Sequence, residues 1–143
     1  PIFLDGKRNY LVVRNVLKTV RKSVFNEIIK AINSMGLTPF FQVNHSELVI
    51  TCKLNSKQIL FAGLDDPEKI KSTTPIDGVI TDIWVEEATE ASYEAVKQLA
   101  KRLRGRSAVK KRLILSFNPI LQSHWIYREY FGGWTDDERF YRE

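Results

Sequence analysis

The sequence predicts an α/β protein whose sheet is mainly parallel and flanked by helices. Short, mostly apolar runs without regular polar alternation, at residues 79–85 and 111–117, are typical of strands buried on both faces. A longer stretch over residues 16–35 carries apolar residues at helical spacing. Strands that alternate with helices along a chain form βαβ units and therefore a parallel sheet.

Composition limits the class of protein. The 143 residues suffice for one domain with a substantial core, and 43% hydrophobic and 27% charged residues are ordinary for a globular protein. No apolar run approaches the ~20 residues of a membrane span. Cys52 is the only cysteine, so an internal disulfide is excluded, and with two distant histidines a metal or thiol site is not expected. The net charge of +5 favours an anionic partner.

The first half of the chain predicts one strand and one helix, followed by a small β region. Residues 10–14 form a β-rich run, and Asn15 is suited to cap a helix over residues 16–35 that ends at Gly36. Three short β segments follow, separated by turn-like polar residues: 38–43, 48–54 and 58–62. They predict an antiparallel meander or edge hairpin beside the parallel core, rather than part of it.

The second half predicts two more strands, each followed by a helix. A turn with no more than one helical turn over residues 64–71 precedes them. In chain order they are a strand over 79–85, a helix over 92–104, a strand over 111–117 and a helix from about Pro119 to Tyr130. Proline is tolerated in the first turn of a helix, which supports a helix start near Pro119.

Two adjacent carboxylates, Glu86 and Glu87, follow the strand over residues 79–85. Open α/β sheets bind ligands at the carboxyl ends of their strands. In phosphate-transferring ATPases that position holds one carboxylate for Mg²⁺ and one group that orients the attacking water. The pattern is that of a Walker B strand, with Glu86 assigned to Mg²⁺ and Glu87 to the water. The alternative is an acidic turn that stabilises the start of a following helix.

Polar residues also end the strand over residues 111–117. Ser116 and Asn118 are expected at the same edge of the sheet as the two glutamates. Their hydroxyl and amide groups are able to hydrogen-bond a phosphate oxygen or a water, and so to report whether a γ-phosphate is present. The alternative is a simple strand-ending turn, because Asn followed by Pro is a common turn start.

Basic residues are concentrated over residues 101–112, where more than half of the positions are lysine or arginine. Arg102, Arg104 and Arg106 are candidates for contacts with DNA phosphates or with an acidic neighbouring subunit. The alternative is a solvated helix end, where cations are favoured by the helix dipole.

Four motifs occur in one order and at one set of spacings: YLVVRNVLKTVRKSVF at 10–25, GLDDPEKIKS at 63–72, IWVEEAT at 83–89 and LSFNP at 115–119. Together they closely resemble the ATPase domain of the phage terminase large subunit. The resemblance is to the branch common in tailed phages and prophages of Gram-positive bacteria. Each motif is weak alone, but the set is specific and covers nearly the whole chain.

The resemblance implies a P-loop-NTPase-type sheet in a DNA-packaging motor. In such proteins an N-terminal ATPase uses ATP and Mg²⁺ to move double-stranded DNA into a procapsid, and a C-terminal nuclease cuts the concatemer. The implied partners are duplex DNA, the terminase small subunit, the portal protein of the procapsid and further copies of the same subunit. No membrane is involved, and the implied location is the cytoplasm of the bacterial host.

The resemblance also implies roles for individual residues. Glu86 becomes the Walker B acid and Glu87 the catalytic glutamate, while Ser116 and Asn118 take the place of the motif that couples hydrolysis to movement. Related motors carry a basic residue between Gly63 and the acidic strand that reaches the neighbouring subunit's nucleotide. Lys71 lies nearest that place and Lys69 second, and a solvated lysine is the alternative. Arg14, at the end of the first strand, either reaches a phosphate or pairs with an acid at the rim.

The 143 residues contain no glycine-rich loop ending in Gly–Lys–Ser/Thr, which a phosphate cradle requires. By the resemblance, that loop should lie upstream of Pro1 and the nuclease carboxylates downstream of Glu143. Residues 1–143 are therefore expected to be a partial ATPase domain that lacks the phosphate-loop strand. The rival interpretations are another nucleic-acid-dependent ATPase, such as a helicase, and a non-catalytic DNA-binding or assembly module.

The absent strand has a structural consequence. In motors of this family we expect it between the acidic strand and the strand over residues 111–117. Without it, both strands would expose unpaired backbone edges. We therefore expect these two strands either to pair directly or to be exchanged between copies of the chain.

Overall fold

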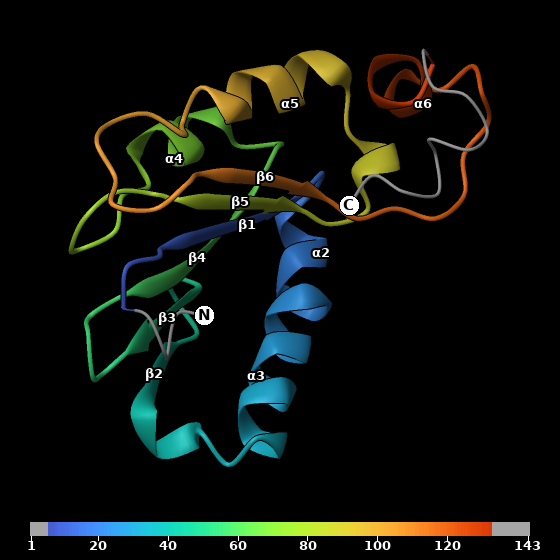
Figure 1. The fold of residues 1–143 in the computed structure, drawn as a ribbon. Coiled ribbons are helices and arrows are strands. Elements are labelled where there is room, and N and C mark those ends of the chain that lie inside the picture. The colour runs from blue at the N-terminus through green and yellow to red at the C-terminus, as the bar shows by residue number, and fades with distance from the viewer. Residues whose placement is uncertain (1–5, 133–143) are drawn as a thin grey trace.

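The computed structural model describes residues 6–132, and within them a six-stranded sheet runs in the order β2-β3-β4-β1-β5-β6 (Figure 1). The remainder of the predicted domain, residues 1–5 and 133–143, lies outside the described residues. In chain order the strands are β1 Tyr10–Arg14, β2 Phe41–Asn44, β3 Val49–Cys52, β4 Gln58–Gly63, β5 Asp82–Val85 and β6 Arg112–Leu115. The predicted α/β fold with a mainly parallel sheet is confirmed.

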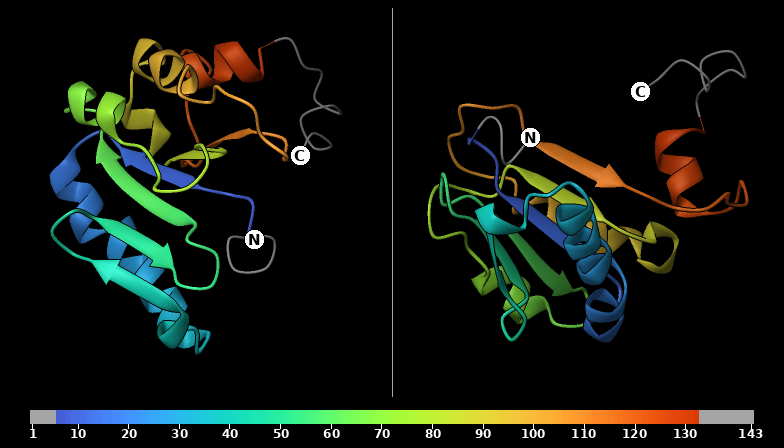
Figure 2. Two further views of the ribbon diagram at one scale, coloured as in Figure 1. Left: turned by 90° about the vertical axis from the view of Figure 1, so that its left-hand side faces the viewer. Right: turned by 90° about the horizontal axis from the view of Figure 1, so that it is seen from below.

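Helices cover both faces of this sheet. In chain order they are α2 Leu17–Lys22, α3 Val24–Ser34, the 3-10 helix η1 Thr38–Phe40, α4 Pro67–Ser72, the 3-10 helix η2 Ala88–Glu90, α5 Tyr93–Ala100 and α6 Trp125–Tyr130. The pair α2 and α3 lies on one face, and α4, α5 and α6 lie on the other (Figures 1 and 2). None of the described helices combines the length and apolarity that crossing a bilayer demands.

Strand alternation divides the apolar side chains between two cores. From β1, Leu11 and Val13 pack toward the α4 and α5 face, whereas Val12 packs toward α2 and α3. In β5, Ile83 and Val85 likewise enter the first core, and Trp84 packs against the second. Such burial on both faces explains why these strands are continuous apolar runs rather than alternating ones.

The antiparallel region is smaller than the sequence predicts. β2 pairs antiparallel with β3, and β3 with β4, as expected. The assignment of residues 58–62 to that region alone was wrong, because β4 also pairs parallel with β1, from Tyr10 opposite Ile59 to Arg14 opposite Gly63. β4 thus joins the parallel core, and its run Leu60, Phe61 and Ala62 is buried accordingly.

The long helix predicted over residues 16–35 is broken at Ser23, which separates α2 from α3. The backbone of Ser23 leaves helical geometry, with φ −114° and ψ −96°, and its hydroxyl donates to the carbonyl of Thr19 at 2.7 Å. Serine side chains compete in this way with the helical hydrogen bonds. The helix also starts after Val16, so the predicted cap at Asn15 was wrong. Apolar spacing misses the break because both halves cover the same core.

Other boundaries also differ from expectation, among them those of the strands predicted over 79–85 and 111–117, which span only Asp82–Val85 and Arg112–Leu115. The segment predicted as a strand from residue 38 begins as η1, since Pro39 fixes φ and lacks an N–H for the ladder. α5 ends at Ala100, before the predicted residue 104, and α6 begins only at Trp125. At α6, the ring Nδ1 of His124 accepts a hydrogen bond from the Ile126 N–H at 3.2 Å, which gives the helix a side-chain cap.

β5 and β6 pair directly and in parallel, with Asp82 opposite Arg112 and Val85 opposite Leu115. This is the first of the two arrangements expected for a sheet without a phosphate-loop strand. The expected position of a missing strand between these two is therefore closed. Within the described residues, β6 forms one edge of the sheet and β2 the other.

A buried carboxylate joins the strands at their amino ends. Asp82 is fully buried, and its Oδ2 accepts from Arg8 Nη1 at 3.0 Å and from Thr81 Oγ1 at 2.7 Å. Its Oδ1 accepts from the Nε of Arg112 on β6. The hydrogen bond that Arg112 donates to Asp82 raises the pKa of the Arg112 guanidinium above its ordinary value. One carboxylate thus holds β6, β5 and the residues that lead into β1.

Asp82→Asn should destabilise the chain by about 3 kcal/mol, because it removes a buried charge on which two guanidinium groups depend. Chemical unfolding followed by tryptophan fluorescence measures the loss. Glu94→Gln is the matched control, since Glu94 pairs with Lys97 at 2.7 Å on the surface of α5 and is 73% exposed. The control should cause no measurable loss. Equal losses of unfolding free energy in the two variants would contradict the conclusion that Asp82 holds these strands together.

Candidate functional site

The carboxyl ends of β1, β5 and β6 meet at one edge of the sheet, at the right of Figure 1. Glu86 directly follows β5, and its N–H donates to the carbonyl of Val13 at 2.9 Å. Ser116 directly follows β6, and its N–H donates to the carbonyl of Val85 at 3.1 Å, while its own carbonyl accepts from Ala88 at 2.9 Å. These backbone hydrogen bonds therefore bring Glu86 and Ser116 together at the carboxyl ends of the strands.

Glu86 is half-buried and lies beside a cation and a hydroxyl. Arg14 Nη1 is 3.8 Å from Glu86 Oε2, and Ser23 Oγ is 3.4 Å from the same oxygen. Arg14 Nη1 also donates to Ser23 Oγ at 3.0 Å. The three side chains form one polar group at the point where α2 ends. Of the two roles expected for Arg14, binding a phosphate or pairing with an acid, this structure shows the pairing with an acid.

Arg14 lies between two carboxylates, because its Nη2 is 3.6 Å from Glu90 Oε1. Its Nε is buried and has no hydrogen-bond partner among the described residues. Buried donors without a partner are rare and costly, so the guanidinium is held here with one hydrogen-bonding group unused. Sequence reasoning missed both Ser23 and Glu90 as neighbours of Arg14. A serine inside an apolar helical stretch was the one available signal for Ser23.

Glu87 has a left-handed backbone, with φ 52° and ψ 50°. A non-glycine residue pays roughly 1–2 kcal/mol for this conformation. Such strain is concentrated at functional sites. Although Glu87 occupies the position before η2, its side chain makes no capping hydrogen bond. Glu87 therefore is not a side-chain cap of η2, and its role, in catalysis or in an acidic turn, stays a prediction.

Ser116 and Asn118 differ in their surroundings. Ser116 Oγ accepts a hydrogen bond from Trp84 Nε1 at 2.8 Å, which fixes the hydroxyl while leaving its proton available for donation. Asn118 is exposed. The coupling role predicted for the two residues stays a prediction.

The GLDDPEKIKS motif forms the turn between β4 and α4. Asp65 Oδ1 accepts from the Leu17 N–H at 3.0 Å, and Asp66 Oδ1 accepts from the Lys69 N–H at 3.1 Å and caps α4. A Cβ on Gly63 would overlap the Asp65 side chain and the Leu17 backbone. Glycine is thus required where the end of β4 meets the start of α2. This turn was noticed as a motif, but its contact with α2 was not predicted.

The basic candidates lie away from these contacts. Lys69 and Lys71 belong to α4, where exposed Lys71 Nζ is 2.8 Å from Glu68 Oε1. Arg102 Nη2 donates to the carbonyl of Thr73 at 2.7 Å and so ties the end of α5 to the end of α4. Arg104 and Arg106 are exposed. Of the three arginines proposed for DNA, Arg102 therefore has a structural contact as well.

The donor set at the carboxyl edge suits Mg²⁺ rather than a metal held by protein alone. Among the described residues no group of three or more His, Cys, Asp or Glu side chains converges. Mg²⁺ is usually held by one or two carboxylates together with waters and substrate phosphates. The carboxylates of Glu86 and the neighbouring Glu87 are the residues that would hold such an ion.

The profile of the phage terminase large subunit family matches residues 3–143. This chain belongs to that family. The PBSX phage terminase large subunit of Bacillus subtilis (strain 168) is 38% identical over 128 residues, which are 90% of this chain and 28% of the relative. The terminase large subunit of Bacillus phage SPP1 is 34% identical over 85 residues, 59% of this chain and 20% of that relative. The chain thus matches 28% of the length of the first terminase and 20% of the second.

Solved structures show the same fold. The large terminase of a thermophilic bacteriophage superposes with a TM-score of 0.70 at 17% identity, covering 92% of this chain and 31% of that protein. Its structure in complex with ADP gives 0.64 at 18% identity, with 97% and 32% covered. The large terminase ATPase domain of a Thermus phage gives 0.61 at 13% identity, with 94% and 57% covered. The terminase resemblance and the P-loop-type fold predicted from the motifs are confirmed.

Gly63→Ala should destabilise this terminase chain by several kcal/mol, because the added methyl meets backbone that has little room to move. Gly36→Ala is the matched control, since Gly36 has a positive φ of 68° but open space around its Cβ position. The control should cost only about 1 kcal/mol. Thermal unfolding compares the two. A smaller loss at Gly63 than at Gly36 would contradict the close approach of β4 to α2.

Proposed function

We propose that this chain is part of the ATPase motor of a terminase large subunit, which uses ATP hydrolysis to translocate double-stranded DNA into a procapsid. The observation that carries the proposal is the pair Glu86 and Glu87 at the carboxyl end of β5, beside Ser116, in a chain of this family. The motor would work in the host cytoplasm with the terminase small subunit, the portal protein and further copies of the large subunit. A phosphate loop and a nuclease would be supplied by other parts of the whole protein.

Each glutamate has a distinct task in the proposal. Glu87 accepts a proton from the water that attacks the γ-phosphate. Glu86 holds Mg²⁺, which neutralises charge on the phosphate oxygens when bound. The strained backbone of Glu87 supports its role, because such conformations occur preferentially at functional sites.

The neighbouring polar residues would connect the nucleotide to movement. Ser116 and Asn118 would sense the γ-phosphate through their hydroxyl and amide groups. Arg14 Nη1 is 3.8 Å from Glu86 Oε2. When a nucleotide binds, Arg14 would leave Glu86 and pair with a phosphate oxygen instead. Lys71, or Lys69 in its place, would reach the nucleotide of a neighbouring subunit.

In the whole protein, Glu87→Gln should bind ATP but hydrolyse it at least ~100-fold more slowly, because the amide is unable to accept the proton of the water. Glu86→Ala should instead weaken Mg²⁺-dependent nucleotide binding. Steady-state phosphate release and the binding of a fluorescent ATP analogue measure the two effects separately.

Glu90→Gln is the matched control for both variants, since Glu90 also lies near Arg14 but is almost half exposed. It should retain most of the hydrolysis rate. Normal turnover in Glu87→Gln, or an equal loss in all three variants, would show that the acidic pair does not have the proposed roles.

Duplex DNA binding by the basic region should weaken as salt rises, because each phosphate contact releases counterions. Replacing Arg104 and Arg106 by Ala should lower the affinity and reduce the slope of log affinity against log salt by about 2, one unit for each lost contact. Fluorescence anisotropy with a short duplex measures both quantities. An unchanged slope would assign these exposed arginines to solvation or to protein contacts instead.

A further inference from the structure

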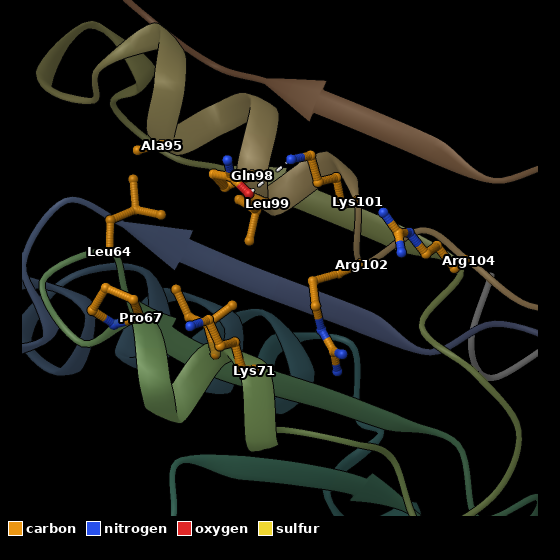
Figure 3. A pocket seen from close by; sticks show the side chains of 10 residues that line it. Leu64, Pro67, Lys71, Ala95, Gln98, Leu99, Lys101, Arg102 and Arg104 are labelled. Atoms are coloured by element: carbon orange, nitrogen blue, oxygen red, sulfur yellow. Dashed lines mark hydrogen bonds between the residues drawn. The ribbon is translucent and has the colours of Figure 1, made fainter.

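A groove lies between α4 and α5, on the face of the sheet opposite α2 and α3 (Figure 3). Its cavity has a volume of about 400 Å³ and is lined on its apolar side chiefly by Leu64, Ile70 and Leu99. Ile70 and Leu99 are only 7% and 2% exposed, so they form a fixed floor. The volume is near the lower end of the ~300–1,000 Å³ typical of ligand sites. It accommodates one or two large apolar side chains rather than a broad protein surface.

The rim of this groove carries positive charge only. Lys71 comes from α4, and Lys101, Arg102 and Arg104 come from the end of α5 and the following loop. No aspartate or glutamate lines the groove. The nearby acid Glu68 pairs with Lys71, but both side chains are at least 70% exposed, and exposed pairs of this kind are weak.

One of the rim cations is held in place by the fold. Arg102 Nη2 donates to the carbonyl of Thr73, and Figure 3 shows the side chain extending from the end of α5 toward α4. Its Nε is buried and has no hydrogen-bond partner among the described residues. A carboxylate is a strong acceptor for the guanidinium of an arginine at such a rim. The groove therefore combines an apolar floor with cations, one of which is already ordered.

We propose that this groove binds a short acidic segment of a partner protein, with an apolar side chain in the cavity and carboxylates on the rim. Helical and extended segments often bind grooves through apolar anchors of this kind. Duplex DNA matches the rim but has no apolar side chain to fill the floor. The cationic rim is complemented by the carboxylates of an acidic segment, and we therefore favour such a segment over a second copy of this groove. The inference does not depend on ATP hydrolysis.

The test uses the full-length protein and a short fluorescein-labelled peptide of aspartate, glutamate, leucine and phenylalanine, with binding followed by fluorescence anisotropy. The double variant Lys101→Glu and Arg104→Glu reverses rim charges and should weaken binding at least ~10-fold. The matched control, Arg106→Glu with Lys110→Glu, changes the net charge equally outside the groove and should stay within about twofold of the parent. Far-ultraviolet circular dichroism confirms that all variants are folded.

Two further binding experiments test whether the apolar floor of the groove contributes to peptide binding. Ala95 lines the cavity, so Ala95→Leu should fill part of it and weaken binding without changing any charge. A peptide in which serine replaces leucine and phenylalanine should also bind more weakly.

Several results would overturn the proposal. Equal losses in the two charge-reversal variants would show that only overall charge attracts the peptide. Binding that is unaffected by Ala95→Leu and by the serine peptide, together with displacement by a short DNA duplex, would show a phosphate-binding surface. Self-association in sedimentation velocity that is abolished by Ala95→Leu would show that a second copy fills the groove.

Discussion

The ion pairs of Asp82 fix the relative positions of the strands on which the candidate site depends. Its carboxylate binds Arg8, which precedes β1, and Arg112, which begins β6. A shift of one residue in either strand would turn the partners to the other face and leave a fully buried charge uncompensated. Removal of the charge is costly for the same reason. The pairs at the amino ends fix the register of β1, β5 and β6. Because β5 and β6 have the same length, Glu86 and Ser116 then emerge side by side at the carboxyl ends.

Several departures from regular geometry lie at that carboxyl edge. The helix break at Ser23 brings a hydroxyl between Arg14 and Glu86, and the left-handed backbone of Glu87 ends the acidic strand. Gly63 allows β4 to approach α2 more closely than any residue with a Cβ. At the opposite ends of the strands, the buried carboxylate of Asp82 is paired with two guanidinium groups. Proteins tolerate local irregularity where function requires it and satisfy their local preferences elsewhere.

Buried apolar runs and helical periodicity sufficed to predict the strands, most helices and the edge where Glu86, Glu87 and Ser116 meet. The parallel pairing of β4 was missed, because a short apolar run has the same pattern in a hairpin and in a parallel core. Ser23 and Glu90 were missed for another reason. Ser23 lies nine residues after Arg14, beyond the intervening helix α2, and Glu90 lies far along the chain, so neither spacing indicates a contact with Arg14. The structural contact of Arg102 with Thr73 was hidden in the same way within a run of basic residues.

The two cores of the sheet differ in how much of the chain each needs. Every fully packed member of the core beneath α2 and α3 comes from residues 12–61, whereas the core beneath α4 and α5 also uses residues as late as Ile126. During synthesis the first core can therefore close before β5 has left the ribosome, since domains form as their segments emerge. We expect the nascent chain to hold a compact unit built from residues 12–61, onto which β5 and β6 are then added. Protease protection of ribosome-bound chains that end shortly after Gly63 would reveal it.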